Sequence, residues 1–125
     1  MIARIWRGRA TSENAPHYHQ HATERVFPSL TKLRGHQGAY LLSREDDGQV
    51  EFLAVTLWDD IGAITAFAGE KPEAAVVEPE ARAVLSSFDE FARHYQVHGA
   101  LDALGLPAAR QQPDMFEGHE PLSKR

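Results

Sequence analysis

The chain has 125 residues, of which 42% are apolar and 25% charged, and this composition predicts one globular domain rather than a disordered chain. The formal charge of −5 argues against a nucleic-acid binder, and no apolar stretch reaches the roughly 18 residues of a membrane helix, so neither nucleic acid nor membrane is predicted as a partner. Cysteine is absent, which excludes disulfides and cysteine nucleophiles and makes a cytoplasmic location the default expectation.

The first predicted element is a strand from Ile2 to Arg9, in which alternation places Arg4 and Trp6 on the same face. The stretch TSENAP that follows is typical of a helix start. We expect this helix to run to about Val26, because Pro28 should end or kink it.

A β-hairpin is predicted next, because the apolar runs Gly38–Arg44 and Val50–Trp58 flank EDDG, a turn signal. A helix should then run from the acidic pair at Asp59 to Gly69, with an apolar stripe on one side. A second, shorter helical stretch is predicted from Pro72 to about Leu85, and a fourth strand from Phe88 to His98.

This order predicts an α+β, ferredoxin-like β-α-β-β-α-β fold with a four-stranded antiparallel sheet. The strand VEFLAVTLW is apolar on both faces, although a sheet with helices on one side should leave its other face polar. We therefore predict a homodimer in which two sheets pack face to face. The domain should cover residues 1–98, and residues 99–125 should form a C-terminal extension that packs on the partner or is partly disordered.

Several stretches resemble the antibiotic biosynthesis monooxygenase-like (ABM) superfamily: MIARIWRG, GAYLL, VEFLAVTLWDDIGAITAFAGE, VVEPEAR and FDEFARHYQV. The resemblance covers roughly residues 1–98 and implies a dimeric α+β barrel. It also implies one of several activities, since the superfamily includes cofactor-independent oxygenation of polycyclic phenols, haem degradation and many members with no known activity.

The resemblance implies a cavity between the sheet and the helices of each chain. Aromatic walls with one cation would suit a planar, partly anionic ligand such as a polyphenol or quinone. Arg4, Trp58 and His94 are the candidate catalytic residues. The candidate ligand-contacting residues are Trp6, Tyr40, Phe52, Phe67 and Tyr95. The alternative is that these aromatic side chains simply form the core, and the sequence leaves open which of His94 and Tyr95 faces the cavity.

The haem-degrading branch is recognised by an Asn in the first strand, a Trp at this strand end and a His on the later helix. Here IARIWRGR has no Asn and PEAAVVEPEARAVL has no His, so only Trp58 matches. Haem handling is disfavoured and no cofactor is predicted. The oxygenase branch also uses an Asn together with a Trp, and the chain departs from that pattern too.

The motif HYHQH raises the question of a metal site. On a helix, His17 and His21 share one face and His19 lies opposite. This spacing can chelate a divalent ion weakly, but only Glu13 and Glu24 could add ligands. We therefore predict a solvated helix face and no metal.

Two functions from different classes follow. The first is a cofactor-independent monooxygenase that acts on an aromatic or quinone-like small molecule. The second is a non-catalytic dimer that binds a small hydrophobic ligand.

Overall fold

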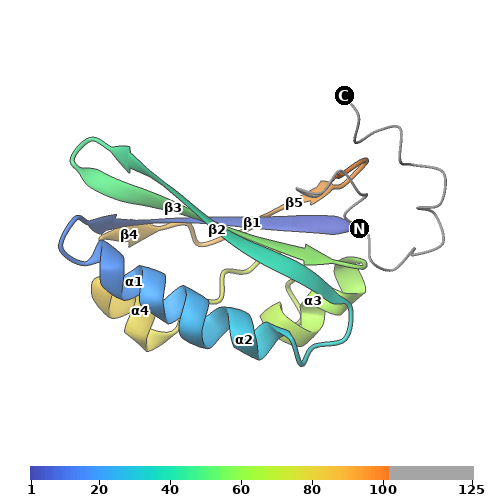
Figure 1. The fold of residues 1–125 in the computed structure, drawn as a ribbon. Coiled ribbons are helices and arrows are strands. Elements are labelled where there is room, and N and C mark those ends of the chain that lie inside the picture. The colour runs from blue at the N-terminus through green and yellow to red at the C-terminus, as the bar shows by residue number, and fades with distance from the viewer. Residues whose placement is uncertain (102–125) are drawn as a thin grey trace.

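The sheet is built around β1 (Ile2–Thr11), which pairs antiparallel along its whole length with β3 (Gln49–Trp58). On its other side β1 pairs with two short strands, β4 (Ser87–Phe88) and β5 (Arg93–Gln96). β2 (His36–Asp46) forms the edge beyond β3. The computed structural model describes residues 1–101 and confirms the predicted α+β, ferredoxin-like fold (Figure 1).

The predicted fourth strand is divided into β4 and β5. Between them, the backbone forms hydrogen bonds with the segment that precedes α4 (Pro79–Val84). The Ala75 N–H donates to the Glu90 carbonyl at 3.0 Å, and the Ala92 N–H donates to the Glu73 carbonyl at 2.8 Å. The predicted helix from Pro72 is therefore confined to α4, because the residues before it pair with this interruption instead.

The first helical stretch continues past the predicted end. α1 (Ala15–His21) leads into a π-helical turn (Ala22–Val26) and then into α2 (Phe27–Leu30). Pro28 is accommodated because it lies in the first turn of α2, where its missing N–H leaves no gap in the hydrogen bonding. The π turn bonds five residues back rather than four, a local widening that is frequent at functional sites.

α3 (Ile61–Ala68) begins and ends as predicted. The Asp60 side chain caps it by accepting a hydrogen bond from the Ala63 N–H at 2.9 Å. Gly69 ends it with a φ of 86°, a backbone conformation that favours glycine. No helix within residues 1–101 is long and apolar enough to cross a membrane.

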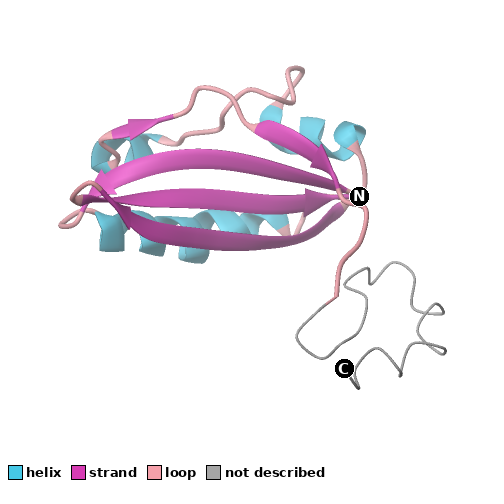
Figure 2. Cartoon of the chain, turned by 90° about the horizontal axis from the view of Figure 1, so that it is seen from above, coloured by secondary structure: helices cyan, strands magenta, loops and turns pink. Residues whose placement is uncertain are grey.

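The helices of residues 1–101 all lie on one face of the sheet, and in the view of Figure 2 the strands lie in front of them. On the helix-covered inner face, Trp6, Phe52 and Trp58 are buried. The opposite surface, here called the outer face, has no helix from residues 1–101 against it. Its apolar side chains are Ala3, Ile5, Tyr40, Leu42, Leu53, Val55, Leu57 and Tyr95. The predicted extension lies outside the described residues, except for its first three positions.

A group of charges stands at the hairpin end of the outer face. Glu51 accepts hydrogen bonds from Arg7 and from Arg44, and only 7% of its surface is exposed. The hydrogen bond from Arg7, followed by that from Arg44, holds the pKa of Glu51 below its ordinary value of 4.5.

This ion group gives an expected pH dependence. The folded state binds a proton at Glu51 less readily than the unfolded chain does. The contribution of Glu51 to the free energy of unfolding is therefore complete above pH 4.5, and it is lost as the pH falls through the lowered pKa. We expect the Glu51→Gln variant to lose this acid-dependent part of the unfolding free energy. Urea unfolding at a series of acidic pH values measures it, with the exposed Glu45→Gln as the control. An unchanged acid dependence in Glu51→Gln would contradict the assignment.

Candidate functional site

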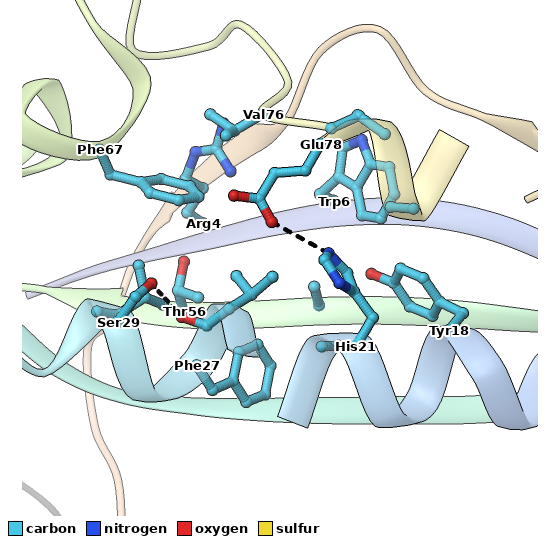
Figure 3. A pocket seen from close by; sticks show the side chains of 16 residues that line it. Arg4, Trp6, Tyr18, His21, Phe27, Ser29, Thr56, Phe67, Val76 and Glu78 are labelled. Atoms are coloured by element: carbon cyan, nitrogen blue, oxygen red, sulfur yellow. Dashed lines mark hydrogen bonds and ion pairs between the residues drawn. The ribbon is translucent and has the colours of Figure 1, made fainter. Parts of the chain in front are cut away.

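A cavity lies between the sheet and the helix layer and is partly open to solvent (Figure 3). β1 and β3 form its floor, the stretch from α1 to α2 forms one wall, and α3, α4 and the segment before α4 close the remaining sides. Its polar lining residues are Arg4, Tyr18, His21, Ser29, Thr56 and Glu78, and its other aromatic lining residues are Trp6, Phe27 and Phe67. The free space measures about 70 Å³, enough for several water molecules.

Arg4 reaches the cavity from the inner face of β1, with 4% of its surface exposed. Its Nη2 donates to the Ala74 carbonyl at 2.6 Å, and its Nε makes a longer contact of 3.5 Å with the Pro72 carbonyl. The guanidinium lies over the Phe67 ring, 5.2 Å from the ring centroid. Burial lowers the pKa of Arg4 to about 10, so the side chain is still a cation at neutral pH.

The charge of Arg4 has no counter-ion in the described chain. No carboxylate of residues 1–101 forms an ion pair with it. A buried cation without a carboxylate is costly to fold, and such groups concentrate where a protein binds or transforms a ligand. The position of Arg4 therefore indicates a subsite for an anionic group.

His21 enters the cavity from the last turn of α1 and is 9% exposed. Its Nε2 lies 3.2 Å from Oε1 of Glu78, close enough for an ion pair when the ring is protonated. The alignment is not that of a hydrogen bond, and Nε2 has no hydrogen-bond partner within residues 1–101. Glu78 immediately precedes α4, and its side chain is 53% exposed. Figure 3 shows both side chains directed into the cavity.

Tyr18 lies one helical turn before His21 and shares its face of α1. Burial raises the pKa of Tyr18, so its hydroxyl stays protonated. Its ring packs on Phe52, with 4.8 Å between ring centroids, and this contact places Phe52 behind the cavity wall. Trp6 lines the cavity, and its indole N–H donates to the Asp89 carbonyl at 2.8 Å, which fixes the ring.

The remaining predicted site residues lie elsewhere. Trp58 is completely buried beside the cavity, where its indole N–H donates to Thr56 Oγ1 at 2.8 Å. His94 pairs with Arg4 across β5 and β1, so it faces the helices but does not line the cavity. Tyr95 is 52% exposed on the outer face. The structure thus settles which of the two neighbours points inward.

The prediction that Tyr40 contacts a ligand is also wrong, for the same reason as for Tyr95. Tyr40 lies opposite Val55 in the hairpin and is 59% exposed on the outer face, so neither tyrosine can contact a ligand in the cavity. The two-residue turn at Asp47 and Gly48 sets this register, because the pairs from Asp46 and Gln49 to Gly38 and Leu57 follow one another without a shift. The bulge between His36 and Gly38 lies at the other end of the hairpin and displaces only His36.

His94 has a distinct environment. Its Nε2 is buried without a hydrogen-bond partner among the described residues. Burial, followed by the positive charge of Arg4, lowers the pKa of His94, and Glu73 opposes this effect. A neutral imidazole beside Arg4 adds no second positive charge at neutral pH.

The histidines of the HYHQH motif have different environments, because two face solvent and one lines the cavity. His17 and His19 are exposed, whereas His21 is buried, so the prediction of a uniformly solvated face is wrong for His21. Within residues 1–101, no group of three or more His, Asp or Glu side chains is placed to hold a metal ion.

Sequence reasoning missed every polar lining residue of the cavity except Arg4, including the ionisable Tyr18, His21 and Glu78. The available signal was the apolar periodicity of the helix, in which Tyr18, Ala22 and Val26 follow one another at helical spacing. His21 lies on this stripe and not on the polar side. Glu78 gave no signal, because its position depends on the irregular segment before α4.

No protein-family model matches the sequence, and no curated protein matches it. Among solved structures, the chain is similar to a putative antibiotic biosynthesis monooxygenase from Deinococcus radiodurans. The two share 18% sequence identity and a TM-score of 0.55 over 84% of this chain and 100% of that one. The chain has this monooxygenase-like fold. The ferredoxin-like α+β fold that the ABM resemblance implies for one chain is therefore confirmed, whereas the implied dimer stays a prediction. The cavity lies between the sheet and the helices of this fold.

Proposed function

We propose that the protein is a cofactor-independent monooxygenase acting on a phenol- or quinone-like aromatic molecule in this cavity. The observation that carries the proposal is the buried Arg4 cation, without a carboxylate counter-ion in residues 1–101, at an aromatic-walled cavity. An aromatic molecule that becomes an anion during the reaction matches both features. The likeness in fold to the Deinococcus radiodurans protein supports the same reaction class.

The chemistry needs a stabilised substrate anion and molecular oxygen. Loss of the phenolic proton places negative charge on the oxygen and on ring carbons, and Arg4 stabilises that charge electrostatically. A ring carbon then bonds to dioxygen, and the resulting hydroperoxide loses water to leave a carbonyl. The balance is one phenol and one dioxygen converted to one quinone and one water, so the substrate itself supplies the electrons.

The small volume of the cavity limits which ligands can enter it without a structural change. At about 70 Å³ the cavity is smaller than the clefts of roughly 300–1,000 Å³ that enclose drug-sized ligands. A ring-bearing ligand therefore requires a wall to shift. Residues 76–78 are suited to this, because they lie outside the helices and beyond the backbone pairing of residues 73–75, and Glu78 is half exposed at the cavity.

We propose that the working form is a homodimer joined through the outer face. That face is apolar at its centre and charged at its hairpin end, the arrangement that interfaces between subunits commonly have. Tyr40, Leu42 and Tyr95 are each about half exposed in one chain, and a second sheet would cover them. The absence of cysteine supports a cytoplasmic location for this dimer.

Oxygen uptake tests the proposed reaction. We expect the protein to consume oxygen with an anthrone or a hydroxynaphthalene, and Arg4→Met to lose at least about 100-fold in rate because it removes the stabilising cation. The exposed Arg34→Met makes the same chemical change on the surface and should match the wild type. An oxygen electrode, with the quinone quantified by chromatography, gives the rate. No uptake by wild type, with tight binding of the same phenols, would instead establish the non-catalytic ligand-binding alternative.

A further inference from the structure

We infer that His21, paired with Glu78, takes the proton from a phenol that enters the cavity neutral and is then held there as its anion. The inference rests on the proposed function only in placing a phenol in this cavity. It follows from two observations: His21 is more than nine-tenths buried at the cavity, and its Nε2 has no hydrogen-bond partner among residues 1–101. A buried polar atom without a partner is costly, and a ligand hydroxyl supplies the missing one.

The other ionisable groups near the cavity are unsuited to accept the proton. Arg4 is already a cation, and the raised pKa of Tyr18 keeps its hydroxyl protonated. His94 faces the helices beside Arg4 but does not line the cavity. Glu78 is the one carboxylate among the described lining residues, and its half-exposed side chain is in contact with water. His21 is therefore the proton acceptor that the cavity offers to a bound hydroxyl.

The charges support the transfer. Before it, the cavity carries the cation of Arg4 and the anion of Glu78. The O–H bond of the phenol then breaks, its proton moves to Nε2 of His21, and the electron pair stays on the phenolate oxygen. The new imidazolium lies 3.2 Å from the Glu78 carboxylate, and the new phenolate is stabilised by Arg4. Each charge that the transfer creates thus has an opposite charge in the same cavity.

This arrangement also selects the ligand class. A carboxylic acid is already ionised at neutral pH, so it gains nothing from His21 and brings its negative charge towards Glu78. A hydrocarbon of the same shape has no proton to give and leaves Nε2 unpartnered. The cavity is therefore matched to acidic phenols that arrive neutral and ionise after binding.

A chromophoric phenol tests the inference without oxygen chemistry. 4-Nitrophenol absorbs in the visible as its anion and not as the neutral form, so titrating the protein with it under nitrogen, below the probe's solution pKa, reports the protonation of the bound probe. We expect wild type to bind it as the anion. In His21→Gln the ratio of anion to neutral probe should fall at least about tenfold, because the proton acceptor is gone.

Matched controls separate this role from a structural one. His17→Gln, on the same helix but exposed, should behave as wild type. Glu78→Gln changes a half-exposed side chain outside the core, and it should also lower the anion ratio, since the imidazolium loses its counter-ion. Nitrobenzene, which lacks the hydroxyl, should bind equally to wild type and to both cavity variants.

Three results would overturn the inference: no binding of the probe to wild type, binding in the neutral form, or an anion ratio that both cavity variants leave unchanged. The outcome is independent of oxygenation. Anion formation that needs His21, together with an absence of oxygen uptake, would contradict the proposed monooxygenase while supporting the proton transfer.

Discussion

Replacing Trp58 with alanine is expected to lower the free energy of unfolding by about 3–5 kcal/mol, as truncation of large buried aromatic residues does. Trp58 has no exposed surface and forms a cluster with the buried Leu30 and Ile64. Its ring stacks on Phe67 at 6.0 Å and meets the edge of His36 at 5.1 Å. Since the free energy of unfolding of small domains is only about 5–15 kcal/mol, this loss is a large share of the stability.

Trp58→Phe distinguishes packing from ligand contact. The smaller ring keeps most of the contacts and loses the hydrogen bond to Thr56, so we expect a cost of about 1–2 kcal/mol. Because Trp58 does not line the cavity, affinity for a phenolic probe should be unchanged. Urea unfolding gives the free energies and probe titration gives the affinity. A large loss of affinity in a stable Trp58→Phe protein would restore the catalytic role that the sequence suggested.

Much of the fold was predictable because local signals and global packing agree. Gln49–Trp58 reads as a strand from its β-branched and aromatic residues alone, and the turn at Asp47 and Gly48 joins it to its neighbour in the sequence. The Asp60 cap and Gly69 define α3 in the same way. In each case the residues that specify the element lie within it or directly beside it.

Prediction failed where distant segments decide the structure. The stretch from Phe88 to His98 alternates like one strand, yet Glu90 and Ala92 bond to the segment at residues 73–75 instead of β1. This pairing joins residues that lie 15 positions apart (Ala75 and Glu90) and 19 positions apart (Glu73 and Ala92). Both segments are irregular, and neither has a sequence pattern that predicts the pairing. The same contacts shorten the predicted second helix to α4.

The candidate site shows the same difference between residues that local sequence patterns place and residues that distant contacts place. Arg4, Trp6 and Phe67 were expected at the cavity that the ABM resemblance implies, and all three line the cavity. His21 was judged by its polar chemistry rather than by its place on the apolar stripe, so its burial was missed. Glu78 could not be placed, because a residue in an irregular segment has no periodicity from which to infer the face that it occupies.

The proposed homodimer leads to the second large expected effect, which concerns Val55. This residue lies at the centre of the outer face, between Ile5 of β1 and Tyr40 of β2. In a two-fold dimer Val55→Asp introduces two carboxylates into the apolar centre of one interface. Burying an unpaired charge costs several kcal/mol, so we expect the dissociation constant to rise at least about 100-fold. Sedimentation velocity over a range of protein concentrations measures this directly.

Two controls make that result specific to the interface. Val55→Thr keeps the shape and β propensity of the side chain without a charge, and it should weaken the dimer far less. Ala66→Asp adds the same carboxylate on the exposed side of α3, away from the outer face, and should leave the dimer intact. If Val55→Asp folds normally and sediments as wild type does, the outer face is not the interface. The half-exposed Tyr40, Leu42 and Tyr95 would then need another partner to cover them.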